Sequence, residues 1–142
     1  MAFGTATVLT NLGRNITADR LQPDASRTHQ SCDGRWGAIG KGATGAARTA
    51  SCTDTALTCE IQSRSCGSIS LATVTVTNDT YQNVGTVTAT SASSSGPQAV
   101  DEAGLFTSTT TGAVEMFASA TFAVVNLNPG DSLQNTWKVQ IT

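Results

Sequence analysis

Polar and apolar residues alternate from Ser68 onward, and this is the strongest local pattern in the chain. In residues 71–77, Val74 and Val76 share one parity with Ala72, and threonines occupy the positions between them. Successive side chains of a strand point to opposite faces of its sheet, so this alternation predicts a half-buried strand.

A second strand is predicted to follow the first and to pair with it. Residues 78–80 tolerate turn geometry, and Tyr81, Val87 and Ala89 then fall on one parity. The two segments together predict a long antiparallel hairpin. Gly85, inside the second strand, predicts either a β-bulge or a close approach of another backbone.

Three further strands are predicted toward the C-terminus. Residues 99–106 and 114–122 have strand patterning, and a strand over residues 133–141 is expected to be pinned in register by Trp137. A Pro-Gly pair within residues 126–131 predicts a turn, because proline presets one φ angle and glycine permits a positive φ at the next position.

The first half of the chain lacks this regularity. Within it, residues 15–21 predict a helical turn or a brief strand, the glycine-rich residues 37–45 predict turns or an irregular crossing, and residues 53–60 predict a short helix. We therefore expect an arm and loop region over residues 1–67 that packs on an antiparallel β core over residues 68–142.

The length of the chain fits one domain, and the predicted strands place it in the all-β class. The chain has 142 residues, of which 39% are hydrophobic and 5% aromatic. The expected fold is an antiparallel β-sandwich or a small β-barrel with an extended, irregular N-terminal arm. So few apolar residues predict a thin core, which favours stabilisation by neighbouring copies or by a partner surface.

Charge and hydropathy argue against nucleic acid and membranes as partners. The formal net charge is −2 and charged residues make up 13% of the chain, which gives no basic field for nucleic acid. The first residues lack a cationic segment, and no run approaches the roughly 20 apolar residues of a membrane span. We expect synthesis in the cytoplasm, with neither nucleic acid nor membrane as a partner.

The four cysteines leave three interpretations open. Cys32, Cys52, Cys59 and Cys66 contain no Cys-x-x-Cys pair, so their spacing does not favour a structural zinc site. Disulfides formed in oxidising surroundings are a second interpretation, and ordinary thiols are the third. We favour the ordinary thiols and predict no metal.

No motif in the sequence predicts catalysis or a cofactor. Residues 40–45 match G-x-G-x-x-G by spacing alone, without the preceding strand and following helix that a phosphate site requires. His29 has no cysteine, serine or acid in a recognisable arrangement. We predict a non-enzymatic protein with no catalytic residues and no cofactor.

Two adjacent carboxylates and one tryptophan are better explained by structural roles. Asp101 and Glu102 should point to opposite faces of a strand and cannot flank one bond as acid and base. Glu102 lies in an apolar setting, so a salt bridge or a backbone clamp is expected, with a ligand-binding carboxylate as the alternative. Trp36 is expected to be a plug packed on the sheet.

Several segments resemble a family of small structural proteins of tailed-bacteriophage virions. The likeness spans roughly residues 30–142, and its segments are Trp36-Gly37, Asp54-Thr55-Ala56-Leu57, Val74-Thr75-Val76-Thr77-Asn78-Asp79-Thr80-Tyr81-Gln82-Asn83-Val84-Gly85-Thr86-Val87-Thr88, Glu102-Ala103-Gly104-Leu105-Phe106 and Asn128-Pro129-Gly130-Asp131-Ser132. The chain departs from the family where Ala38-Ile39 follows Gly37 in place of Thr-Gly, where Thr107 replaces an acidic residue, and in its cysteine cluster.

The resemblance implies a place in a virion. Family members are described as capsid decoration (cement) proteins, tail-fibre proteins or virion structural proteins. The implied function is a capsid decoration protein, a homotrimer that bridges and stabilises subunits of the major capsid protein on the outer shell. The alternative is a tail, fibre-anchoring or baseplate protein that binds tail proteins of the same virion, again made in the host cytoplasm.

Two sets of residues are singled out for these roles. For contact with an acidic capsid surface we expect Arg14, Arg20, Arg27 and Arg35, with solvated surface arginines as the alternative. For structural roles in the β core we expect Trp36, Glu102, Phe106 and Trp137.

Overall fold

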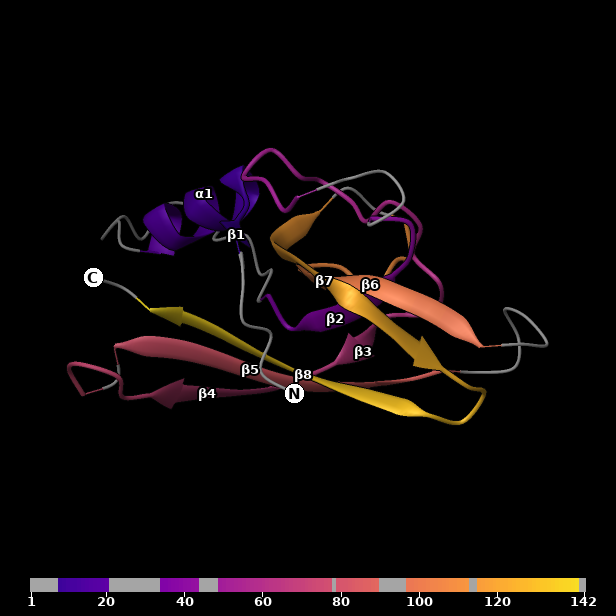
Figure 1. The fold of residues 1–142 in the computed structure, drawn as a ribbon. Coiled ribbons are helices and arrows are strands. Elements are labelled where there is room, and N and C mark those ends of the chain that lie inside the picture. Colours follow the sequence, from indigo (N-terminus) through magenta and orange to yellow (C-terminus); the bar gives the residue numbers. More distant parts are fainter. Residues whose placement is uncertain are drawn as a thin grey trace.

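Two antiparallel β-sheets packed on each other form most of the molecule, as the computed structural model shows (Figure 1). Residues 8–20, 34–43, 49–77, 79–89, 97–112 and 115–140 are described. The five-stranded sheet has the order β1 (Val8–Leu9), β7 (Met116–Leu127), β6 (Gln98–Phe106), β2 (Trp36–Gly40), β3 (Ser65–Cys66). The three-stranded sheet has the order β4 (Ser68–Ala72), β5 (Thr80–Thr88), β8 (Ser132–Gln140). The expected all-β sandwich is confirmed.

The predicted C-terminal strand and its preceding turn are both present. β8 pairs with β5 from Thr80↔Gln140 to Thr88↔Ser132 without a register shift. The turn before β8 is closed by the N–H of Asp131, which donates to the carbonyl oxygen of Asn128 at 2.9 Å, and Gly130 has a φ of +94°. Pro-Gly therefore acts as expected, because only glycine adopts this φ without strain.

Gly85 does not form a bulge. The β5–β8 register runs through Gly85↔Asn135 without interruption. A Cβ atom at Gly85 would lie 3.6 Å from the Cα of Gly67, which precedes β4. The predicted bulge is therefore absent, and the distance to Gly67 is an ordinary van der Waals contact, so a close approach that requires glycine is not found either.

The predicted strand over residues 71–77 is wrong in its position. β4 runs over Ser68–Ala72 and pairs with β5, so the hairpin exists, but residues 73–77 leave the sheet. Val74 and Val76 are 57% and 66% exposed, so they do not lie on a buried face. The cause is the carboxylate of Asp79, which accepts the backbone N–H groups of residues 74–76 and curls them into a turn.

The first half of the chain contributes strands that the pattern did not indicate. β2 lies inside the five-stranded sheet and pairs with β6 from Trp36↔Phe106 to Gly40↔Glu102. It contains two glycines and is buried on both faces, so it shows no alternation of polar and apolar residues. The expectation of arm and loop throughout residues 1–67 is therefore wrong for β1, β2 and β3.

A helix, α1 (Asn11–Arg20), covers one end of the five-stranded sheet (Figure 1). It begins four residues before the helical turn predicted from residue 15, because the hydroxyl oxygen of Thr10 accepts the N–H of Gly13 at 3.1 Å as an N-cap. A Cβ atom at Gly13 would lie 2.2 Å from the carbonyl oxygen of Phe117, so glycine permits this close packing on β7.

The short helix predicted over residues 53–60 is absent. Asp54 accepts the N–H of Ser51 at 2.9 Å and the hydroxyl of Ser119 at 2.7 Å. Its carboxylate therefore holds a turn against β7 and does not start a helix.

The core between the layers combines alanines with larger aliphatic and aromatic side chains. One cluster surrounds Trp137 of β8 and includes Ile16 of α1 and Phe117 of β7. A second joins both sheets through Ile39, Val87 and Leu133. The predicted thin core also contains buried side-chain polar atoms without a hydrogen-bond partner, namely Asn83 Oδ1, both amide atoms of Asn135, and Trp137 Nε1.

Candidate functional site

Glu102 lies buried in β6, where it clamps a neighbouring loop. Its Oε1 atom accepts the N–H of Cys59 at 3.2 Å, and its Oε2 atom accepts the hydroxyl of Thr58 at 3.2 Å. A Cβ atom at Gly40 would lie 2.6 Å from Oε1, so glycine leaves room for the carboxylate. The backbone clamp expected for Glu102 is therefore present.

Asp101 binds another stretch of the same connection between β2 and β3. Its Oδ1 atom accepts the N–H of Ala43 at 3.1 Å, and its side chain is buried. The β6–β7 register shifts between Val100 and Glu102, so simple strand alternation does not apply at this point. Each carboxylate accepts a backbone N–H from a different stretch of the connection between β2 and β3, which gives both residues a structural role.

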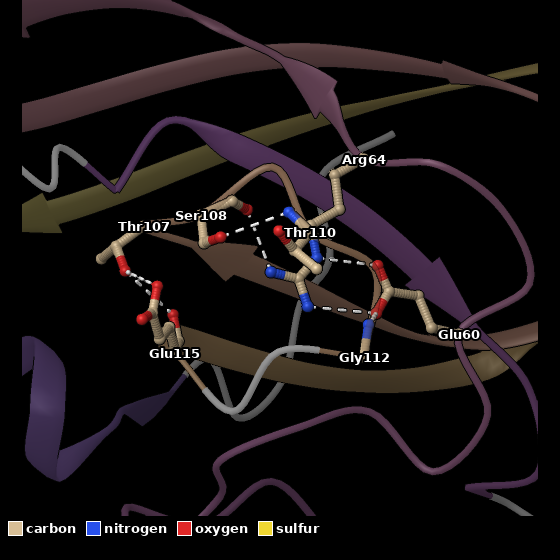
Figure 2. Close-up of polar contacts among 7 residues, drawn as sticks. All are labelled: Glu60, Arg64, Thr107, Ser108, Thr110, Gly112 and Glu115. Atoms are coloured by element: carbon tan, nitrogen blue, oxygen red, sulfur yellow. Dashed lines mark hydrogen bonds and ion pairs between the residues drawn. The ribbon is translucent and has the colours of Figure 1, made fainter.

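A buried ion pair fastens the loop between β6 and β7 (Figure 2). Arg64 donates to both carboxylate oxygens of Glu60, at 2.8 and 3.1 Å, and to the carbonyl oxygen of Ser108 at 3.0 Å. Glu60 also accepts the N–H of Gly112 at 2.9 Å. The guanidinium lies 3.5 Å from the centre of the Phe106 ring. These contacts attach Ser108 and Gly112 of the loop to Arg64 and Glu60.

The other candidate structural residues lie in the sandwich. Trp36 is part of β2 and is half-buried against the cluster that contains Leu57 and Phe106, which agrees with the expected packing on the sheet. Phe106 is fully buried, and Trp137 faces the core of the sandwich from β8.

The four candidate arginines are not all placed. Arg14 is exposed on α1, and Arg35 is half-buried just before β2. Arg27 and the side chain of Arg20 lie outside the described residues. The structure therefore does not test whether the four side chains form one basic surface.

The cysteines in the described part of the chain are free thiols. Cys52 is half-buried, whereas Cys59 and Cys66 are exposed. Among residues with a described position there is no group of histidine, cysteine and acidic side chains that fits a metal ion. Cys32 and His29 lie outside those residues, so the zinc and disulfide interpretations stay untested.

An exposed apolar surface, which we call the apolar edge, lies along β4 and the turn that follows it. Its residues are Ile69, Leu71, Val74 and Val76, with exposed fractions of 39, 63, 57 and 66%. Ile69 and Leu71 lie opposite Asn83 and Tyr81 of β5, whose side chains face the core, but the five-stranded sheet does not cover them. Contiguous exposed apolar residues mark interaction sites in soluble proteins.

Asp79 fixes the shape of the tip of the apolar edge. Its carboxylate accepts the N–H groups of Val74, Thr75 and Val76 at 2.9, 2.8 and 3.0 Å, and the side-chain amide of Gln140 at 2.9 Å. The N–H groups of Val76 and Val74 contribute most to holding the pKa of Asp79 well below its ordinary value of 3.8. The two valines are therefore presented on a turn of defined geometry.

This turn should keep its structure until the solution becomes strongly acid. A carboxyl group whose pKa is lowered by folding stabilises the folded state above its unfolded pKa, here about 3.8, and this contribution is lost as the pH falls through the folded pKa. The amides of residues 74–76 should keep their hydrogen-bonded NMR shifts from neutral pH to below 3.8, and lose them on further acidification.

An Asp79→Asn variant provides the control for this pH dependence. A neutral amide cannot titrate, so the same amide shifts should be altered at neutral pH and should vary little with acidification. Wild-type shifts that change with a midpoint near 3.8 would contradict the lowered pKa.

Together, the fold and the surface define a β-sandwich held by internal polar clamps, with one apolar strand edge left exposed. Comparisons with protein-family models, with curated proteins and with solved structures found no match for this chain. The single helix among the described residues is too short and too polar to cross a membrane.

Proposed function

We propose that this protein is a structural component of a tailed-bacteriophage virion, a capsid decoration protein that binds and stabilises subunits of the major capsid protein. The observation that carries the proposal is the apolar edge, because an exposed edge strand with apolar side chains is a ready site for association with other subunits. Many such weak contacts, repeated over the copies of a shell, stabilise it through multivalency.

The positions of the family-like segments support the proposal. Trp36-Gly37 in β2 pairs directly with Leu105 and Phe106 in β6. The segment 74–88 contains β5, which pairs with β8 beside the Pro-Gly turn. Segments that carry the resemblance therefore form the frame of one sandwich, as expected if the likeness reflects a shared fold.

As part of this proposal, the N-terminal region makes the contact with the capsid. Arg14 lies on the exposed face of α1, opposite Ile16, which is buried in the core. Its guanidinium is available to an acidic surface, and a homotrimer would present three such helices together.

The copy number of the protein in purified virions tests the proposed function. A decoration protein should be present at the same order of abundance as the major capsid protein, as measured by quantitative mass spectrometry of virions. An abundance far below that of the capsid protein favours the tail, fibre-anchoring or baseplate alternative. Absence from virions would contradict both.

The assignment of Arg14 is tested in the same particles with charge-reversal variants. Arg14→Glu should lower occupancy on the shell, because it removes attraction to an acidic surface and adds repulsion. Lys138→Glu makes the same change at an exposed site on β8 and should leave occupancy unchanged. Substitution is preferable to deletion of residues 1–30, because deletion would remove Ile16 from the core.

A further inference from the structure

The outer side of β4 has no strand partner among the described residues. β4 is the terminal strand of its sheet and is hydrogen-bonded to β5 on one side only. Four of its five residues are exposed and the fifth is half-buried. An edge strand of this kind presents a row of backbone N–H and C=O groups that can pair with another strand.

β4 also lacks the features that usually prevent such pairing. Proteins protect open edges with charged side chains, prolines or bulges. No charged residue and no proline occurs between Arg64 and Asp79, and the β4–β5 register has no shift. Like-charge repulsion therefore does not oppose the approach of an identical strand.

The sequence of β4 is self-complementary in an antiparallel arrangement. If Ser70 lies opposite Ser70 of a second copy, Ile69 lies opposite the copy's Leu71, and Leu71 opposite its Ile69. These apolar side chains project to the same face of the sheet in both copies, because positions 69 and 71 share one parity. Cross-strand apolar pairs stabilise such a ladder.

We propose that β4 pairs antiparallel with β4 of a second copy of this chain about a two-fold axis at Ser70, which joins two three-stranded sheets into one six-stranded sheet. The pairing covers Ile69 and Leu71, which the chain's own five-stranded sheet leaves exposed. The contact rests on the proposed assembly role and names its partner as a sister subunit. It closes after two copies, so a trimer would need a separate surface.

Complementary charges at Ser70 test both the partner and the register. Lysine at position 70 would face lysine in the second copy, so Ser70→Lys should weaken pairing by about tenfold or more. Ser70→Asp should do the same through its carboxylates. A mixture of the two variants should restore pairing as a heterodimer, because lysine then lies opposite aspartate. Native mass spectrometry and light scattering measure each species.

The control is Thr86→Lys, which adds the same charge to an exposed position of β5, on the same outer face but away from the edge. It should self-associate like the wild type. In wild-type protein, hydrogen exchange of the amides in Ser68–Ala72 should slow as the concentration rises, and it should not slow in Ser70→Lys.

Three outcomes would overturn the pairing: a wild-type chain that stays monomeric at its solubility limit, a closed trimer with rapidly exchanging β4 amides, or Ser70→Lys and Ser70→Asp variants that do not rescue each other. These results are separate from the virion measurements. A chain that pairs through β4 but is absent from virions would refute the proposed function alone, and an abundant virion protein without β4 pairing would refute this inference alone.

Discussion

Replacing Arg64 with alanine should lower the free energy of unfolding by about 3–5 kcal/mol, because it leaves the Glu60 carboxylate in a buried position without its cation. The substitution also removes the hydrogen bond to the carbonyl oxygen of Ser108 and the contact with the Phe106 ring. Both interactions stabilise the loop between β6 and β7. Chemical denaturation followed by circular dichroism and tryptophan fluorescence measures the loss.

A double variant separates the effect of charge from the effect of shape. Glu60→Gln with Arg64→Met removes both charges and keeps an amide oxygen to accept the N–H of Gly112. It should recover at least half of the stability lost in Arg64→Ala, because no isolated charge remains buried. Equal loss in the single and double variants would contradict the explanation by an uncompensated charge.

Replacing Glu102 with alanine should lower the free energy of unfolding by about 2–4 kcal/mol. The N–H of Cys59 and the hydroxyl of Thr58 lose their acceptor, and the loop that contains them loses its attachment to β6. A cavity would also form beneath Gly40. The same denaturation experiment measures the effect.

Glu102→Gln is the matched variant. Its side chain has nearly the same shape and keeps an oxygen for the N–H of Cys59, so the loss should be less than half of that in Glu102→Ala. If glutamine is as disruptive as alanine, the clamp depends on negative charge and not on hydrogen-bond geometry. If alanine has almost no effect, Glu102 does not hold the loop.

Alternation predicted the strands that have one face on the core. β5 and β8 place Val87, Leu133 and Trp137 toward the other sheet, and the residues next to them are polar and exposed, so a period of two is visible in the sequence. The pattern does not reveal that Asn83 and Asn135 are also buried on these strands. β6 and β7 are also predicted, from strand patterning over residues 99–106 and 114–122, although parts of both strands are buried on two faces.

The pattern of polar and apolar residues fails where specific hydrogen bonds decide the local conformation. β2 is a five-residue segment with two glycines, and its identity as a strand comes from pairing with β6 more than 60 residues later. Residues 73–77 carry strand-like alternation, but the Asp79 carboxylate competes successfully for their backbone N–H groups. Secondary-structure propensity alone predicts neither interaction.

The candidate site was only partly visible in the sequence. A backbone clamp at Glu102 follows from a carboxylate in an apolar strand, since such a group needs a partner. Alternation does not predict the apolar edge, because it places Val74 and Val76 on a buried face, whereas both are exposed. The spacing Glu60-x-x-x-Arg64 was a signal for the ion pair, and the long uncharged run before Asp79 was a signal for an unprotected edge.

The contact between Thr10 and β7 has a consequence for how the chain reaches its native state. The Thr10 hydroxyl donates to the carbonyl oxygens of Met116 and Phe117, so the N-cap of α1 is completed by residues more than 100 positions away. The residues of β1 and α1 leave the ribosome long before β7, against which they pack, has been synthesised. Closure of such long loops is entropically costly and makes folding slow. During that interval the growing chain exposes unpaired strands, so its yield should depend on chaperones and on a low rate of synthesis.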